Sequence, residues 1–166
     1  MKIKFKALCS TLNLLTLSHE QKKIVSGYSG HYEVTLLLNA CIGLLFICNE
    51  KSELKDIIKN NSKPLFEFGI TEEQITICKK GSVDEAKTLE AVVRHIRNSI
   101  AHCHFIHPNE NAKTTSKITE LTFIDQLNDS PSSPKTFEYK TGVEDFKKFL
   151  LEVSNLILKN EKTSNQ

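Results

Sequence analysis

The stretch that decides the fold is residues 34–48, VTLLLNACIGLLFIC, an apolar run of 15 residues that is interrupted by Thr35, Asn39 and Gly43. Crossing a bilayer takes about 20 apolar residues, so this run predicts a buried helix and no membrane partner. A helix that lacks a polar face over about four turns must pack against neighbours on most of its sides. We therefore expect a helix over residues 31–59 to lie at the centre of the fold.

Outside this run, the composition is that of one ordinary globular domain. Of the 166 residues, 39% are hydrophobic and 25% are charged, and two domains would each fall near the lower size limit for an independent core. Lys plus Arg total 22 and Asp plus Glu total 20, which gives a net charge of only +2. A site for nucleic acid must therefore be a local cluster of cations. The five cysteines form no C-x-x-C pair, which predicts reduced thiols in a cytoplasmic protein.

The sequence around the central helix predicts further helices. Residues 3–25 carry apolar side chains at three- and four-residue spacing, which indicates mostly helical structure. Residues 82–85, SVDE, fit a capping box that opens a helix running to about Phe105. The connector at residues 60–81 is expected to be irregular, apart from a short helix near Thr71.

The C-terminal part of the chain changes character. Residues 117–125 and 135–140 are rich in Thr, Phe, Ile and Tyr on either side of a polar, proline-containing loop, so they predict a β-hairpin over residues 117–140. An amphipathic helix with one apolar stripe follows, and a polar tail at 161–166 ends the chain. We therefore predict a single mainly α domain over residues 1–160, a helical bundle of about four to five helices with the hairpin inserted before the C-terminal helix.

The predicted helix 82–105 carries the candidate functional side chains. Both arginines of the chain lie on it, and four of the six histidines fall within residues 95–107. At 100° per residue, one side of this helix is apolar and forms a core face. The opposite side mixes small, aromatic and hydrogen-bonding side chains where a solvated face would carry Lys and Glu, so it predicts a second contact surface. This opposite side consists of Ala91, Arg94, Asn98, Ala101, His102 and Phe105, with Arg97 on the flank.

Arg97, Asn98 and His102 together provide the groups that phosphoester cleavage needs. A guanidinium can bind two phosphate oxygens, an amide can orient a neighbour, and an imidazole titrates near neutrality. Attack by an internal hydroxyl requires a base, a stabilising charge and an acid, and it requires no metal. One histidine serves in one proton transfer, so a second must come from elsewhere, and a two-fold copy of the helix would supply it. Arg94 is a candidate second phosphate contact one turn earlier.

Residues 97–102, RNSIAH, resemble the R-x4-6-H motif of the HEPN superfamily, including the polar residue that commonly follows its arginine. The position of the motif, on a late helix after a long apolar helix, is similar as well. The resemblance implies a homodimer through the helix 82–105, with two motifs in one cleft. By position, Arg97 would bind and stabilise the phosphate, Asn98 would orient the phosphate or the histidine, and His102 would be the acid or base.

The resemblance also implies an activity. Many members of the superfamily are metal-independent ribonucleases that act as toxins or in phage defence and leave 2′,3′-cyclic phosphate ends. This chain is accordingly expected to be an endoribonuclease that binds RNA and needs no cofactor, and an antitoxin or another regulatory protein is a candidate partner. The alternative is a non-catalytic HEPN-like module for RNA or protein, in which Arg97 and His102 hold a phosphate without cleaving it.

Two other interpretations of the same residues stay open. In the simpler one, Arg97 is a solvated or salt-bridging residue and His102 is a packed histidine with one hydrogen bond. The other is a zinc site, because His102, Cys103, His104 and His107 are ligand types within six residues. A tetrahedral site needs two more oriented ligands than the Cys103–His107 pair provides, and the chain has no other Cys/His pair. We therefore expect no metal.

Overall fold

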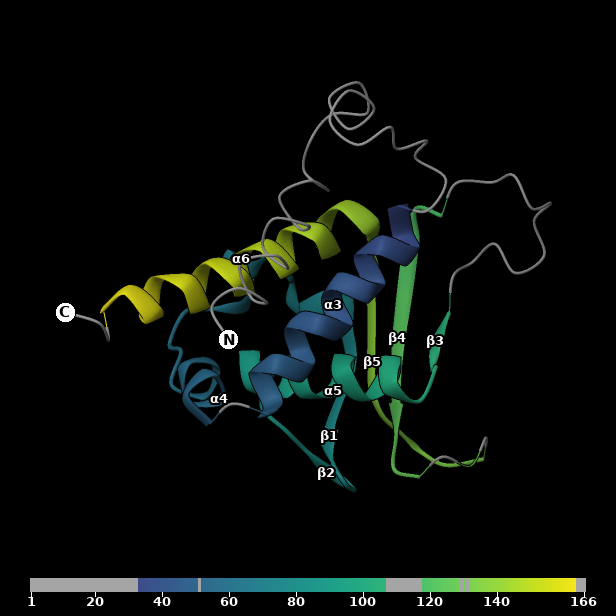
Figure 1. The fold of residues 1–166 in the computed structure, drawn as a ribbon. Helices are drawn as coiled ribbons and strands as arrows, with labels where there is room; N and C mark the ends of the chain where they lie inside the picture. The colour runs from purple at the N-terminus through teal and green to yellow at the C-terminus, as the bar shows by residue number, and fades with distance from the viewer. Residues whose placement is uncertain (1–32, 51, 107–117, 129, 131, 164–166) are drawn as a thin grey trace.

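The apolar run forms most of helix α3 (Glu33–Glu50), which is packed on several sides as expected. Leu37, Cys41 and Leu44 of α3 have no exposed surface, and helices α4, α5 and α6 all contact it. The helix predicted over residues 31–59 is two helices, because a separate α4 (Ser52–Lys59) follows α3. None of the helices in the described part of the chain combines the length and apolar character needed to cross a membrane. The computed structural model describes residues 33–50, 52–106, 118–128, 130 and 132–163 (Figure 1).

A five-stranded antiparallel sheet packs beside these helices, with the strand order β2-β1-β5-β4-β3. The segment predicted to be a hairpin supplies β4 and β5, the two longest strands, with Phe123 opposite Tyr139. Both of these aromatic residues have no exposed surface, so the hairpin is part of the core and not an appendage. The strands are β1 (Ile75–Lys80), β2 (Val83–Asp84), β3 (Phe105–Ile106), β4 (Glu120–Gln126) and β5 (Lys135–Gly142).

The prediction of a mainly α helical bundle is therefore wrong, because the fold is mixed α/β. Residues 60–81, expected to be irregular, contain β1. The alternation that identifies a strand is broken there by a register shift between Ile75 and Ile77, so the buried residues Ile75 and Cys78 lie three positions apart. Strands β2 and β3 have two residues each, too few to show any alternation. Before β1 lie the 3-10 helices η1 (Leu65–Phe68) and η2 (Glu72–Gln74).

Helix α5 (Leu89–Ala101) is shorter at both ends than the helix predicted over residues 82–105. Its N-cap is Thr88, whose hydroxyl accepts a hydrogen bond from an amide of the first turn at 3.2 Å. Residues 82–85, expected to be a capping box, instead complete the tight turn between β1 and β2 and contain the whole of β2. Gly81 lies in this turn with a φ of 66°, a conformation that favours glycine. Serine serves turns and helix caps alike, which explains the error.

Helix α5 lies between two layers, with α3 on one side and strand β4 on the other (Figure 1). The face predicted to be a second contact surface therefore packs partly on the protein's own sheet, and Ala91 is only 1% exposed. At its C-terminal end this face becomes exposed, at Ala101 and His102. Phe105 is not on the helix at all, because it belongs to β3. The buried residues of α5 are Leu89, Ala91, Val92, Val93, His95, Ile96, Ser99 and Ile100.

Helix α6 (Val143–Thr163) starts directly after β5 and completes the core with its predicted apolar stripe. Phe146 and Phe149 have no exposed surface, and the helix contacts α3, α4 and η1. It continues into the segment expected to be a polar tail. Outside the described residues lie the helix predicted over residues 3–25, His107 and residues 164–166.

Candidate functional site

The RNSIAH motif ends at a well-defined helix terminus. Cys103 has a left-handed backbone with a φ of 56°, and its amide donates to the Ile100 carbonyl at 3.1 Å. The His104 amide donates to the Ser99 carbonyl at 2.7 Å. These two hydrogen bonds form a Schellman motif, which closes a helix and usually has glycine in the left-handed position. As a result His102 is the C-cap of α5 and is exposed.

Of the residues considered as zinc ligands, His102 is the C-cap of α5, and Cys103 and His104 follow it. The rings of His102 and His104 stack, with centroids 6.0 Å apart and 28° between their planes. Imidazole lone pairs lie in the ring plane, so stacked rings do not direct their nitrogens toward a common ion. Cys103 is exposed because the left-handed turn takes it out of the helix. Within the part of the chain that the structure describes, His102, Cys103 and His104 therefore do not converge on a metal.

The guanidinium of Arg97 is held by its neighbour Asn98. Arg97 donates to Asn98 Oδ1 through Nε at 3.2 Å and through Nη2 at 2.6 Å. Asn98 Nδ2 in turn donates to Oδ2 of Asp125, on strand β4, at 3.0 Å. The amide expected to orient the phosphate or the histidine therefore orients the arginine, and it is itself fixed by the sheet.

Asp125 links this pair to a buried histidine. His95 Nδ1 lies 2.7 Å from Asp125 Oδ2, and because an ionised carboxylate only accepts, the imidazole donates. His95 is 3% exposed and Asp125 is 6% exposed, and the imidazole stacks on Phe137 with ring centroids 4.7 Å apart. Buried polar groups of this kind are tolerated when they are hydrogen-bonded. A continuous chain of hydrogen bonds thus runs from His95 in the core through Asp125 and Asn98 to Arg97.

A second ion pair lies on the other side of His95. The Arg94 guanidinium forms a short hydrogen bond to the Glu85 carboxylate. The same Arg94 nitrogen, Nη2, lies 3.1 Å from His95 Nε2, and Glu85 Oε2 lies 3.4 Å from that imidazole nitrogen. Arg94, predicted to be a second phosphate contact, therefore already has a carboxylate partner. Arg97 forms no ion pair within the described residues, so its charge is the less compensated of the two.

Both carboxylates of this network are stabilised in the ionised form. Burial raises the pKa of Asp125, but the hydrogen bonds from His95, Asn98 and the Gln126 amide, together with the interaction with the charge of His95, outweigh burial, and the net pKa lies below the ordinary value. Burial also raises the pKa of Glu85, and the hydrogen bond and charge of Arg94 bring its net pKa below the ordinary value. Each group therefore carries a negative charge at neutral pH.

Cys78, Glu85 and His95 are metal-ligand types whose donor atoms all lie within 4.8 Å of one another. Two features of the site oppose a metal there. Burial, followed by the charge of Glu85, raises the pKa of the Cys78 thiol, whereas a metal requires the thiolate. The Arg94 guanidinium is bonded to Glu85 and lies next to His95 Nε2, so it already supplies the positive charge that a metal ion would bring.

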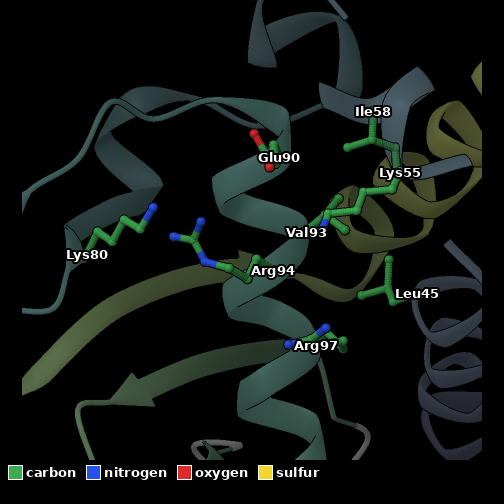
Figure 2. Close-up of a pocket in the computed structure, with 8 residues that line it drawn as sticks. All are labelled: Leu45, Lys55, Ile58, Lys80, Glu90, Val93, Arg94 and Arg97. Carbon is green, nitrogen blue, oxygen red and sulfur yellow. The ribbon is translucent and has the colours of Figure 1, made fainter. Parts of the chain in front are cut away.

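Arg97 and Arg94, the two predicted phosphate-binding residues, line one pocket beside α5. The pocket has a volume of about 290 Å³ and is formed by residues of α3, α4, β1 and α5 (Figure 2). His102 is not among its lining residues. The structure therefore brings Arg94, Arg97 and Asn98 together along α5 and leaves His102 at the exposed end of the helix.

Sequence reasoning missed the roles of His95, Asp125 and Glu85, although one signal was present. Leu121, Phe123 and Asp125 follow one another at two-residue spacing, and all three are buried on β4. An acidic residue at an inward position of a strand needs a buried partner, which makes Asp125 a candidate. The partner of Asp125 could not be identified from the sequence, because His95 lies 30 positions away in the chain.

Comparison with known proteins gives one result. A family model described as HEPN pEK499 p136 matches residues 1–164, almost the whole chain. A comparison with curated proteins found no match, and a comparison with solved structures found none either.

Proposed function

This chain belongs to the HEPN pEK499 p136 family, which confirms the HEPN resemblance of its motif, and on that premise we propose that it is a metal-independent endoribonuclease of the toxin or phage-defence kind. The observation that carries the proposal is that Arg97 of the RNSIAH motif is fixed by hydrogen bonds, while His102 is exposed at the end of the same helix. The substrate is RNA, because the attacking group is the ribose 2′-hydroxyl. As the 2′-oxygen bonds to phosphorus, the bond to the 5′-oxygen breaks, which leaves a 2′,3′-cyclic phosphate.

In this proposal Arg97 binds the non-bridging oxygens of the scissile phosphate. Its guanidinium is already oriented by Asn98, so little reorganisation is needed when negative charge develops in the transition state. Asp125 and His95 are positioning residues, because they act on Arg97 only through Asn98. His102 carries out one proton transfer, either from the 2′-hydroxyl or to the leaving 5′-oxygen.

The other proton transfer falls to His102 of a second copy of the chain. Part of the predicted contact face is occupied within the protein, since Ala91 is buried and Asn98 is bonded to Asp125 of the sheet, so we place the dimer contact at the C-terminal end of α5, where Ala101 and His102 are exposed. Two such ends would bring two imidazoles to one phosphodiester. An antitoxin or regulatory protein that covered the same end would keep the enzyme inactive.

The proposal is tested by incubating a labelled single-stranded RNA with the purified protein in EDTA. We expect cleavage that the chelator leaves intact and that ends in a 2′,3′-cyclic phosphate. His102→Ala should slow cleavage by about 10²–10⁴-fold, the usual worth of general acid–base catalysis. Ser62→Ala, at an exposed position in the loop after α4, is the control and should have little effect.

The same RNA with 2′-deoxyribose at every position should remain intact, because it lacks the nucleophile. Equal cleavage by wild type and His102→Ala would contradict the assignment of the histidine. Binding of the RNA without cleavage by either protein would support the non-catalytic module instead.

A further inference from the structure

The pocket beside α5 concentrates positive charge from three elements of the fold. Lys55 of α4, Lys80 of β1, and Arg94 and Arg97 of α5 line it, against one carboxylate, that of Glu90. Figure 2 shows the Lys80 side chain extending toward the Arg94 guanidinium, with Arg97 one turn along the helix. Cations are not gathered around a concave surface by packing alone, because like charges repel. Their convergence indicates an anionic ligand.

Much of this charge is not compensated within the protein. Arg94 is paired with Glu85, but Lys55 and Lys80 form no ion pair with any other residue that the structure describes. Arg97 donates to the uncharged amide oxygen of Asn98. Three uncompensated cations therefore surround a pocket that has one carboxylate of its own.

The other part of the pocket is apolar. Leu45, Ile58 and Val93 contribute to its lining, and all three belong to the hydrophobic core. The volume of about 290 Å³ is close to the lower end of the range of small-ligand pockets, about 300–1,000 Å³. A surface with cations on one part and aliphatic side chains on another suits a phosphate joined to a nucleoside.

We propose that this pocket binds a backbone phosphate of the RNA substrate next to the scissile one, with the attached nucleoside against the aliphatic lining. The inference rests on the proposed function for its substrate, because Arg97 belongs to both the motif and the pocket. Arg97 is then shared by the two phosphates, while Lys55 and Lys80 contact only the neighbouring one. The pocket therefore adds affinity for the RNA on one side of the scissile phosphate.

The test compares two adjacent lysines of β1. Lys80→Ala removes a cation from the pocket, and Lys79→Ala is its matched control, because Lys79 is not among the lining residues and lies 3.8 Å from Asp84. The probe is a fluorescent single-stranded RNA with 2′-O-methyl groups, which the enzyme cannot cleave. We expect Lys80→Ala to weaken binding about fivefold or more and to reduce the salt slope by about 1, and Lys79→Ala to change binding less than twofold. Lys80→Arg should restore binding.

Kinetics with a cleavable RNA separate this inference from the proposed function. Lys80→Ala should raise KM and leave kcat unchanged, whereas His102→Ala should lower kcat. If wild type cleaves RNA but Lys79→Ala and Lys80→Ala behave alike, the pocket assignment is wrong and the nuclease stands. If wild type cleaves no RNA but Lys80→Ala selectively weakens binding, the nuclease is wrong and the assignment of the pocket to an RNA phosphate stands. Tighter binding of a free nucleoside monophosphate than of the RNA would overturn the assignment to an RNA phosphate.

Discussion

At the scale of single residues, Asp125 is the carboxylate on which the arrangement of Arg97 depends. It accepts hydrogen bonds from His95 at 2.7 Å and from Asn98 at 3.0 Å, and it is almost completely buried. The energetic consequence is a pKa below the ordinary value. A carboxyl group with a lower pKa in the folded state than in the unfolded state stabilises the fold above its unfolded pKa and loses that effect as the pH falls.

The lowered pKa of Asp125 leads to a prediction about stability in acid. The free energy of unfolding of wild type should fall as the pH drops below about 5, because the unfolded carboxyl group, with a pKa of about 4, binds its proton more readily than the folded one. Asp125→Asn should be less stable than wild type at pH 7, and its stability should depend less on pH. Urea denaturation at pH 7 and pH 3 measures both effects, and an Asp125→Asn variant with the same pH dependence as wild type would contradict them.

At the scale of secondary structure elements, the predicted and observed N-caps of α5 differ. The pattern placed the cap at Ser82, but the structure places it at Thr88, whose hydroxyl accepts a hydrogen bond from the first turn. Loss of an N-cap costs about 1 kcal/mol, whereas an exposed turn residue contributes little.

We therefore predict that Thr88→Ala lowers the free energy of unfolding by about 1 kcal/mol and that Ser82→Ala changes it by less than about 0.5 kcal/mol. Both residues precede α5 in the chain. Thermal or chemical denaturation of the two variants measures the two changes in the free energy of unfolding. A larger loss in Ser82→Ala than in Thr88→Ala would mean that the helix begins earlier than described.

The same contrast explains how much of the fold could be predicted. The apolar run of α3, the stripe of α6 and the β-rich segments of β4 and β5 are long, regular patterns, and each appears in the structure. Strand β1 was not predicted because its bulge breaks the alternation of buried and exposed residues. Strands β2 and β3 were not predicted because two residues are too few to show such an alternation. With three strands missed, a sheet was mistaken for an isolated hairpin.

The candidate site was predictable to a similar extent. The adjacency of Arg97 and Asn98 follows from their places in the chain, and the structure joins them by hydrogen bonds. The link to Asp125 and His95 depends on which strand lies beside α5, and that is a property of the tertiary fold. For this reason the positioning residues could not be found from the helix alone.

At the scale of the whole molecule, the sheet limits where a second copy can bind. Asn98, in the face that was expected to form the dimer contact, is bonded to Asp125 of β4, and Ala91 of the same face is buried, so the exposed Ala101 end is the part that remains for the proposed interface. A bulky charge there would oppose association by steric conflict and desolvation cost.

Ala101→Arg should therefore give a monomer without ribonuclease activity and with an unchanged melting temperature. Ser62→Arg, at an exposed position in the loop after α4, is the matched control. It should leave the oligomeric mass and the ribonuclease activity unchanged. Light scattering after size exclusion measures the mass of each variant. An Ala101→Arg protein that remained dimeric and active would place the interface elsewhere.

The left-handed residue that terminates α5 has a practical consequence, because it is a cysteine. Among the cysteines whose side chains the structure describes, Cys41 and Cys78 are buried and Cys103 alone is exposed. With Cys9 and Cys48 replaced by serine, a nitroxide spin label would attach at one position, directly beside the motif histidine. Pulsed electron resonance could then measure the separation of two such labels, and so follow the approach of two helix ends in solution without a crystal.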